Sequence, residues 1–346
     1  MISKSPDHTA LPLSEVSVPL DQLIDLLERI LARYGASSTV AAQLARNCAA
    51  AEADGAKSHG VFRIPGYVST LKGGWVDGHA EPIVEDTAPG IIAVDARNGF
   101  AQPALALAAP RLVERAHANG IAMACIRDSH HFGALWLDVE PFARKGFIAL
   151  ACVNAIARVV PHGGRKPVFG TNPMAFAVPR LGEMPLVFDQ ASSAMANGDI
   201  KLAAKDRRSV DRGVGVDSDG EPTTDPAAIV DGGALLPFGG HKGSSIALMI
   251  EVLAAALTGG QFSFEVKLSP DAEVPRTGQT VILIDPAKGG GQFFGERIET
   301  LIGAVKASGA GRLPGDLRYE RRRQTQSTGV PLSRAEMNKL AELLAD

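Results

Sequence analysis

The sequence predicts an α/β protein in which a core of short apolar strands lies between helical N- and C-terminal portions. Apolar residues recur at helical spacing between Leu20 and Tyr34, and short apolar runs bounded by turn residues fill the middle of the chain. Near the C-terminus, Ser333 and Glu336 have the spacing of a capping box, which predicts a last helix. The 346 residues can bury a large core and, by default, form two domains.

Three helices are expected in the N-terminal portion. The first ends near Gly35, and an alanine-rich helix follows over residues 39–53. Residues 58–67 are expected to form the third helix, broken near Pro65. In such a helix His59 and Arg63 occupy positions i and i+4 and project from one face.

Strands and helices are expected to alternate in the middle of the chain. Helices are predicted over residues 103–119, ending at Gly120, and over residues 134–145. An apolar helix over residues 244–257 is too uniform for a surface helix, so we expect it to pack centrally. Strands are predicted at residues 91–94, 121–126, 147–153, 174–178, 186–188 and 281–284.

The composition excludes several classes of protein. A formal net charge of -3 and 5% aromatic residues give no basis for a nucleic-acid partner. No apolar run reaches the roughly 18 residues of a membrane span, and the polar segment before residue 15 does not resemble a secretory signal. The three cysteines (Cys48, Cys125 and Cys152) are isolated, as in a reducing compartment. A cytoplasmic enzyme is expected.

Familiar catalytic and nucleotide-binding motifs are missing. No GxGxxG follows a strand, and the glycines of residues 239–244 lack the spacing of a phosphate loop. The histidines do not have metal-ligand spacing, so no metal is expected, and there is no GxSxG nucleophile turn.

Two histidine-containing segments are candidates for chemistry. His130 and His131 follow an apolar run and precede a predicted helix, a turn whose free N–H groups suit a phosphate. The alternative is that one of them is a packed histidine. On the helix predicted earlier, His59 can exchange a proton, Arg63 can hold a carboxylate and Ser58 can relay. The alternative there is a chance pair on a surface helix.

Three turn-rich segments are weaker candidates. Residues 161–164 and 170–173 offer Thr171 and backbone amides to a small polar substrate, although glycine, asparagine and proline alone explain such turns. Residues 189–193 leave a predicted strand in the manner of a nucleotide-binding loop.

Taken together, these segments resemble the malate/L-lactate dehydrogenase family whose fold is not a Rossmann fold. The resemblance extends over residues 16–322 and departs mildly at Ser192-Ser193, where the family usually has Thr-Ser. It is carried by the segments SHGVFRIPGY, DSHHFGALW, PHGGRKPVFGTNP, FDQASSAMANGD, DGEPTTDP, LLPFGGHKGSS and RLPGDLRYE.

The resemblance implies a predominantly antiparallel sheet that binds NADPH, with NADH possible, in a homodimer. Residues 1–85 would be the helical N-terminal part of a dimerisation and catalytic domain. Residues 86–310 would form the NAD(P)H-binding α/β domain with a small inserted subdomain. Residues 311–346 would pack back on the N-terminal domain.

Roles for individual residues are implied by the same resemblance. His59 corresponds to the family's proton donor, with Ser58 and Asp199 as relay partners. Arg63 corresponds to the ligand of the substrate carboxylate, and Thr171 also faces the substrate. The implied cofactor contacts are His131, Phe132, Gly133, Ala134, Leu135, Asp189, Gln190, Ala191, His241, Lys242, Arg312, Leu313, Pro314 and Gly315.

Two segments, HHFGALWLDVEPFA and PHGGRKPVFGTNP, resemble the family's cyclic-imine reductases. They imply NADPH-dependent reduction of the cyclic imino acids Δ1-piperideine-2-carboxylate and Δ1-pyrroline-2-carboxylate to L-pipecolate and L-proline, as in catabolism of D-lysine, D-proline or hydroxyproline. A 2-oxoacid reductase of the malate or lactate dehydrogenase type is the alternative. A non-catalytic sensor of dinucleotides is disfavoured by the intact set of His59, Arg63 and Asp199.

Overall fold

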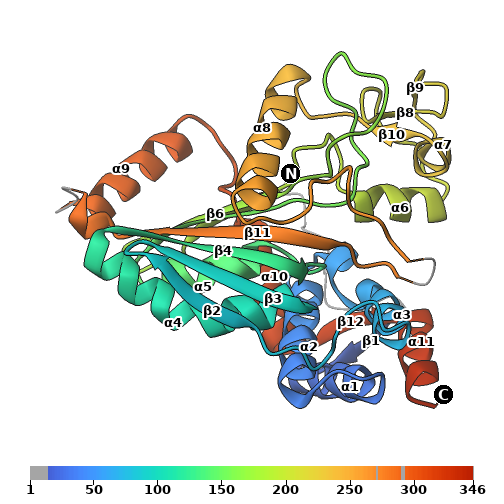
Figure 1. Cartoon of the computed structure of the whole chain (residues 1–346), viewed down its shortest axis with the longest axis horizontal. Coiled ribbons are helices and arrows are strands. Elements are labelled where there is room, and N and C mark those ends of the chain that lie inside the picture. Colours follow the sequence, from blue (N-terminus) through green and yellow to red (C-terminus); the bar gives the residue numbers. More distant parts are fainter. Residues whose placement is uncertain (1–14, 270–271, 290–292, 346) are drawn as a thin grey trace, which may run out of the picture.

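A seven-stranded sheet forms the centre of the computed structural model, which describes residues 15–269, 272–289 and 293–345. The strand order is β2-β3-β4-β11-β5-β6-β7 (Figure 1). The strands are β2 (Ile83–Ala88), β3 (Ile91–Phe100), β4 (Ile121–His130), β5 (Ile148–Val153), β6 (Met174–Val178), β7 (Leu186–Gln190) and β11 (Arg276–Ile284). The strands predicted from the sequence are therefore confirmed, with β3, β4 and β11 longer than expected, whereas β2 was not predicted.

The sheet is mixed. β3 and β4 pair in parallel, and the other neighbouring strands pair antiparallel. The parallel pair exists because helix α4 (Ala101–Asn119) carries the chain from the end of β3 back to the start of β4. Gly120 ends this helix with a φ of 81°, as a left-handed C-terminal glycine does. The expectation of a predominantly antiparallel sheet is therefore correct, although it did not include the parallel pair of β3 and β4.

Helices cover both faces of the sheet (Figure 1). α4 and α5 (Trp136–Arg144) pack on one face, where Leu112, Val139 and Phe142 join the apolar core. On the other face, α8 (His241–Glu251) continues into a π-helical turn, η3 (Val252–Ala256), which packs on β11. The apolar helix predicted over residues 244–257 is therefore real, but its central packing is wrong, since Leu248 is 56% and Val252 52% exposed.

The two ends of the described chain share a second apolar core. It contains α1 (Leu20–Arg33), α2 (Ser38–Ala53), α3 (Ile64–Lys72) and α11 (Arg334–Ala345). Strands β1 (Glu15–Val18) and β12 (Val330–Ser333) pair beside these helices. The capping box is confirmed, because the Glu336 carboxylate accepts the N–H of Ser333 at 2.7 Å and Ser333 Oγ accepts the N–H of Glu336 at 3.2 Å.

A small subdomain and two further helices complete the described chain. The subdomain contains a three-stranded sheet and two helices: β8 (Gly215–Val216), β9 (Pro222–Thr223), β10 (Ala234–Leu235), α6 (Asn197–Lys205) and α7 (Pro226–Val230). α9 (Phe294–Ala307) lies at the edge of the molecule, and α10 (Asp316–Thr328) packs against α2. None of these five secondary-structure elements of the subdomain was predicted.

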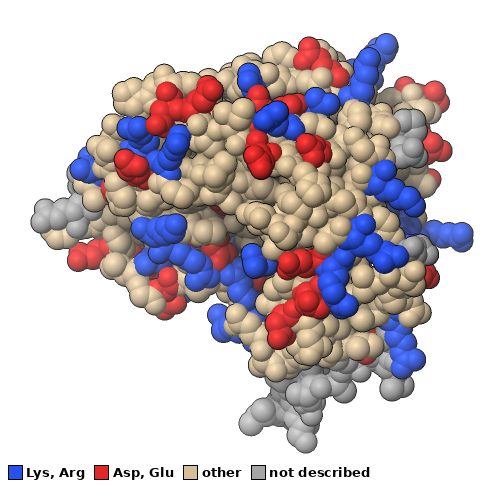
Figure 2. Space-filling view, turned by 60° about the horizontal axis from the view of Figure 1, so that its bottom comes forward, with Lys and Arg blue, Asp and Glu red and all other residues tan. Residues whose placement is uncertain are grey.

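The surface charge and the lengths of the helices bear on the expectations for the whole chain. Basic and acidic side chains are interspersed on the face that Figure 2 presents. Among the described residues, no helix is long and apolar enough to cross a membrane. The polar segment before residue 15 lies outside the described residues, and the expected domain limit after residue 85 lies within β2.

Candidate active site

The segment that carries His59 and Arg63 is not one helix. A 3-10 turn (η1, Lys57–His59) is followed by Gly60, a second 3-10 turn (η2, Val61–Arg63) and then α3. Gly60 has a non-helical φ of -90° and ψ of -136°, so the predicted i and i+4 relationship is wrong. Pro65 does not break a helix either, because it lies in the first turn of α3, where a missing N–H costs nothing.

His59 and Arg63 nevertheless face a common space. Both border a cavity of 130 Å³ together with Thr171, Asn154 and Pro173. Both also border an adjoining cavity of 450 Å³, which is lined further by residues 189–191 and 196–199. The structure therefore brings His59, Arg63 and Thr171 together, through a backbone path that the periodicity of the sequence did not indicate.

Arg63 is a buried cation without a carboxylate partner in the described structure. Arg63 is 7% exposed, and its Nε has no hydrogen-bond partner. Its guanidinium lies 4.0 Å from the centre of the Phe132 ring. Burial lowers the pKa of Arg63, partly offset by nearby groups including Tyr67. Because an uncompensated buried charge is costly, this arrangement favours binding of an anion.

His59 is neutral in this environment. Burial above all, together with the electrostatic effect of Arg63 and His131, lowers its pKa to about 3. Its Nδ1 lies 3.1 Å from Ser58 Oγ, so the hydroxyl fixes the orientation of the ring. A neutral His59 can accept a hydrogen bond at a ring nitrogen, and a bound anion that offsets the charge of Arg63 would raise its pKa.

The first turn of α6 lies next to the same side chains. A Cβ on Gly198 would stand 3.0 Å from Ser58 Cβ and 3.1 Å from Arg63 Nη2, so glycine permits this close approach. Asp199 borders the larger cavity, but within the described residues no hydrogen bond joins it to His59. The ring is held by Ser58 instead.

The two adjacent histidines have separate structural roles. β4 continues through His130, which is fully buried and tied to Asn98 at 2.9 Å and to the Val274 carbonyl at 3.2 Å. The alternative of a packed histidine is therefore correct for His130. His131 borders the smaller cavity, and its Nε2 lies 2.8 Å from the Asp138 carboxylate.

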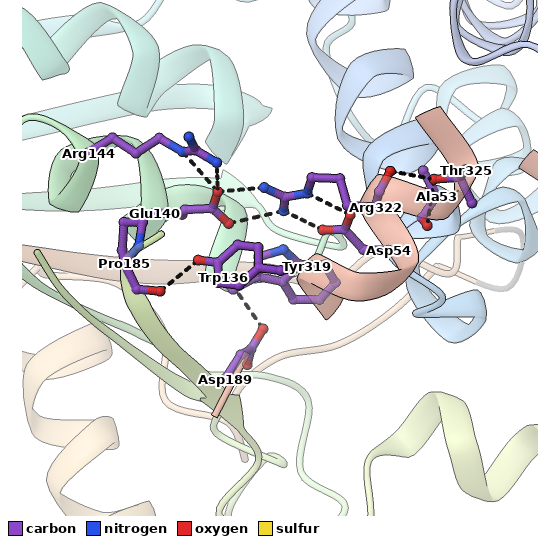
Figure 3. A network of polar contacts seen from close by, with 10 residues as sticks. All are labelled: Ala53, Asp54, Trp136, Glu140, Arg144, Pro185, Asp189, Tyr319, Arg322 and Thr325. Atoms are coloured by element: carbon purple, nitrogen blue, oxygen red, sulfur yellow. Dashed lines mark hydrogen bonds and ion pairs between the residues drawn. The ribbon is translucent and has the colours of Figure 1, made fainter. Parts of the chain in front are cut away.

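The helix end behind these histidines does not offer free N–H groups to a phosphate. Asp189, at the end of β7, accepts the N–H of Trp136 at 3.0 Å (Figure 3). Burial raises the pKa of Asp189 to about 6, against the lowering effect of this hydrogen bond. The protein's own carboxylate thus occupies the start of α5, and the predicted phosphate position there is wrong.

The implied cofactor residues lie in several places. Phe132 and Gly133 border the smaller cavity, while Ala134 and Leu135 are buried and border neither of the two cavities. Asp189, Gln190 and Ala191 border the larger cavity. A third cavity, of 270 Å³, is lined by Arg312, Leu313 and Pro314, and Gly315 caps α10 beside it with a φ of 92°. His241 and Lys242 are exposed at the start of α8 and border none of these three cavities.

Sequence reasoning missed Arg318 and Trp136. The Arg318 guanidinium lies 4.2 Å from the centre of the Trp136 ring, and its Nη1 is buried without a partner. Both residues border the larger cavity. The sequence shows only a basic run on a polar helix, which gives no sign that one arginine turns inward.

Arg322, four residues further along α10, anchors this arrangement. It donates to Asp54 at 2.8 Å and to Glu140 at 2.6 and 3.0 Å, which ties α10 to α2 and α5 (Figure 3). Glu140 also accepts from Arg144, and the Tyr319 hydroxyl donates to the Pro185 carbonyl at 2.9 Å. The fixed helix holds Arg318 over the cavity.

The pattern of a known family matches nearly the whole chain. The description of that family is malate/L-lactate dehydrogenase, and the match covers residues 18–341. The chain belongs to this family. Membership makes the protein an oxidoreductase and implies a nicotinamide nucleotide as its cofactor. Among the described residues, no group of three or more His, Cys, Asp or Glu side chains is placed to hold a metal ion.

Curated relatives and a solved structure are similar over the same length. A Δ1-pyrroline-2-carboxylate/Δ1-piperideine-2-carboxylate reductase from Pseudomonas syringae pv. tomato is 54% identical and covers 98% of this chain and 99% of its own. A relative with the same name from Pseudomonas putida is 55% identical over 95% of this chain and 97% of its own. The crystal structure of the Δ1-piperideine-2-carboxylate reductase from Pseudomonas syringae pv. tomato superposes with a TM-score of 0.93, at 54% identity, over 95% of this chain and 99% of its own.

Proposed function

We propose that this protein reduces the C=N bond of Δ1-piperideine-2-carboxylate and Δ1-pyrroline-2-carboxylate with NADPH, giving L-pipecolate and L-proline. The observation that carries this proposal is the buried guanidinium of Arg63, which has no carboxylate partner among the described residues, beside a neutral His59 in one cavity. A carboxylate next to a cyclic imine offers the anion that Arg63 lacks. The names of the relatives at 54% and 55% identity support the same substrates.

Each residue of the cavity then has a stated task. Arg63 holds the carboxylate through two parallel hydrogen bonds, and Thr171 borders the same substrate. When bound, the reduced nicotinamide nucleotide supplies a hydride to C2. The electron pair of the C=N bond moves to the ring nitrogen, which keeps the proton that it carried as an iminium ion, and a neutral amine results.

His59 keeps the imine protonated in this mechanism. With Nδ1–H donated to Ser58 Oγ, Nε2 accepts the N–H of the iminium ion. An imine that arrives protonated needs no acid from the enzyme, which suits a histidine whose burial lowers its pKa to about 3. Asp199, beside the larger cavity, is proposed to act on His59 through Arg63, whose charge it partly offsets.

A 2-oxoacid reductase remains the second candidate. Lys201 and Arg158 also border the smaller cavity, and these cations suit the second carboxylate of a substrate such as oxaloacetate. That reaction requires protonation of a carbonyl oxygen, for which a neutral His59 is poorly suited unless substrate binding raises its pKa. Since Arg63 would bind the carboxylate of either substrate, the protonation state of His59 does not separate the two candidates, and the names of the relatives at 54% and 55% identity favour the cyclic imine.

The residues present fit a nicotinamide nucleotide. The unpartnered Arg318 Nη1 at the larger cavity suits an anionic group such as the pyrophosphate. We assign Arg312 and Arg323, which border the third cavity with Leu313 and Pro314, to the phosphate that distinguishes NADPH from NADH. His241 and Lys242 border none of these cavities, so a contact with the cofactor requires α8 to move toward it or the cofactor to extend beyond the cavities.

We further propose a cytoplasmic homodimer. Exposed apolar side chains on α8 (Leu248 and Met249), at the start of η3 (Val252) and on α9 (Leu301 and Val305) are more than a single soluble chain usually shows on such helices. Ile302 is the one residue buried within α9, which therefore packs weakly on its own chain. The free cysteines, all buried, suit a reducing compartment.

NADPH oxidation, followed by absorbance at matched substrate concentrations, tests the reaction. The substrates are Δ1-piperideine-2-carboxylate, Δ1-pyrroline-2-carboxylate, pyruvate and oxaloacetate. Turnover with the imines alone, and faster with NADPH than with NADH, is the expected result. Turnover with the oxoacids alone would overturn the proposal and establish the second candidate.

A further inference from the structure

We infer that Glu251, which does not border the cavity, is the positioning residue that sets the substrate end of the site. Glu251 lies at the end of α8, on the side facing inward, and is 4% exposed. Within the described residues its hydrogen-bond partners are Asn172 and Ser263, and neither is a cation. A buried carboxylate without a cation must be satisfied by hydrogen-bond donors, and the identity of these donors shows what it holds.

The first donor is Asn172, next to Thr171. Asn172 Nδ2 donates to Glu251 Oε1 at 2.8 Å and to the Ala247 carbonyl at 3.1 Å. Its Oδ1 accepts the N–H of Ala155, which borders the smaller cavity, at 3.3 Å. Asn172 is fully buried with a φ of 37°, a conformation that costs a non-glycine residue energy and persists only where its surroundings impose it.

The second donor is Ser263, in the loop after η3. Its N–H donates to Glu251 Oε2 at 3.0 Å and its hydroxyl donates to Oε1. The Ser263 carbonyl in turn accepts the N–H of Ala157 at 3.0 Å. Glu251 therefore joins three separate segments: α8, the turn of Thr171, and the loop that borders residues 155–157.

The backbone is shaped to bring this carboxylate inward. The π-helical turn begins at Val252, directly after Glu251, and the Ala254 carbonyl lies 1.8 Å from where a Cβ on Gly278 would stand. Glycine in β11 thus allows the wide turn to approach the sheet. Gly170 is required in the same way, because its Cβ would lie 2.5 Å from Asn172 Oδ1.

Thr171 is held on its other side as well. The N–H and the hydroxyl of Ser192 both donate to the Thr171 carbonyl, at 2.8 and 3.0 Å. The backbone of Thr171 is therefore fixed from both directions while its side chain borders the cavity with Arg63. Since this inference rests on the proposed function, which makes Thr171 a substrate contact, its test includes a readout independent of turnover.

The test compares Glu251→Gln with Glu265→Gln. A glutamine at 251 places an NH₂ group against the N–H donors of Asn172 or Ser263, whereas Glu265 is an exposed carboxylate of the neighbouring loop that accepts the N–H of Phe262 at 2.9 Å. For Glu251→Gln we expect a KM for the imine raised at least tenfold and kcat changed less than threefold. The Kd of NADPH stays within twofold, and Glu265→Gln leaves all three unchanged.

Hydrogen–deuterium exchange of the peptides covering residues 153–173 is the independent readout. Exchange should accelerate in Glu251→Gln and not in Glu265→Gln, whatever substrate the wild type turns over. Unchanged exchange in Glu251→Gln overturns the inference. Faster exchange with an unchanged KM overturns it as well, because Glu251 would then have only a structural role. If Glu251→Gln does not fold, Ser263→Ala removes one donor to the same carboxylate, and the same outcomes decide. Failure of the wild type to reduce either imine would overturn the proposed function without affecting the exchange result.

Discussion

The carboxylate of Glu52 occupies the space where a side chain on Gly60 would stand. Glu52 Oε2 accepts the N–H of Val61 at 2.9 Å and lies 2.0 Å from the position of a Cβ on Gly60. The absence of a side chain at residue 60 therefore lets α2 fix the break between the two 3-10 turns. That break, rather than a continuous helix, turns His59 and Arg63 toward one cavity.

Gly60→Ala should disable the site. The added methyl group collides with Glu52 Oε2 at 2.0 Å and with Glu52 Cβ at 2.9 Å, so the turn or α2 must move. Overpacking of this kind costs about 1–3 kcal/mol of stability, and we expect kcat/KM for the imine to fall roughly 100-fold, as displacements of about 1 Å can cause. Gly303→Ala is the matched control, since nothing lies within 4 Å of its Cβ position. Steady-state kinetics and thermal unfolding of both variants would contradict the argument if they were alike.

Glu52 should also make stability depend on pH. Burial raises its pKa from 4.5 to about 7 in the folded protein, so between these values the folded state binds a proton that the unfolded state has lost. The contribution of this proton to the free energy of unfolding is fully present below pH 4.5 and is lost as the pH rises through about 7. Its size is on the order of 3 kcal/mol. Glu52→Gln removes this dependence.

Chemical denaturation at pH 5 and pH 8 measures that difference. Relative to the wild type, Glu52→Gln should gain stability on going from pH 5 to pH 8. A constant difference between the two proteins would show that Glu52 does not titrate in this range, and Glu265→Gln supplies the exposed control.

Elements determined by their local sequence were predicted, whereas conformations imposed by contacts with other elements were not. Elements with strong periodicity and a clear stop, such as α1, α4 with Gly120 and the capping box of α11, were predicted correctly. The break at Gly60 was not predicted, because Glu52 on α2 imposes it. A turn over residues 170–173 was expected, but not the φ of 37° at Asn172 or its contact with Glu251, which lies 79 residues further along the chain. The same holds for the site. Motifs identified His59, Arg63 and Thr171, whereas Arg318 was invisible because its inward orientation depends on the contacts of Arg322 with Asp54 and Glu140.

Arg63→Met should separate activity from stability. The guanidinium is buried with an unpartnered Nε, so its removal relieves a desolvation cost and should raise the melting temperature. The same change removes the proposed ligand of the substrate carboxylate. Loss of one partner of a buried charge pair costs about 2–5 kcal/mol, so kcat/KM for the imine should fall roughly 30-fold to several thousand-fold. Arg63→Lys should not restore it, because lysine cannot form the two parallel hydrogen bonds. A variant that is both less stable and fully active would place the carboxylate ligand elsewhere.

Arg318→Met should weaken the binding of the cofactor and leave the substrate site intact. Arg318 borders the larger cavity with its Nη1 unpartnered, and its guanidinium is held over Trp136 by the fixed helix α10. Methionine keeps the contact with the ring and removes the charged donors. A hydrogen bond to a charged group contributes about 1.5–3 kcal/mol, which corresponds to a Kd of NADPH raised roughly 10- to 150-fold.

Fluorescence titration with NADPH measures this Kd directly, without turnover. The KM for the imine at saturating NADPH should stay within about twofold, because Arg318, which shares the larger cavity with His59, Arg63 and Thr171, does not border the smaller cavity. Arg334→Met, at an exposed position on α11, is the control for loss of a positive charge. If both variants bind NADPH as the wild type does, the cofactor does not contact Arg318 and its pyrophosphate must lie elsewhere.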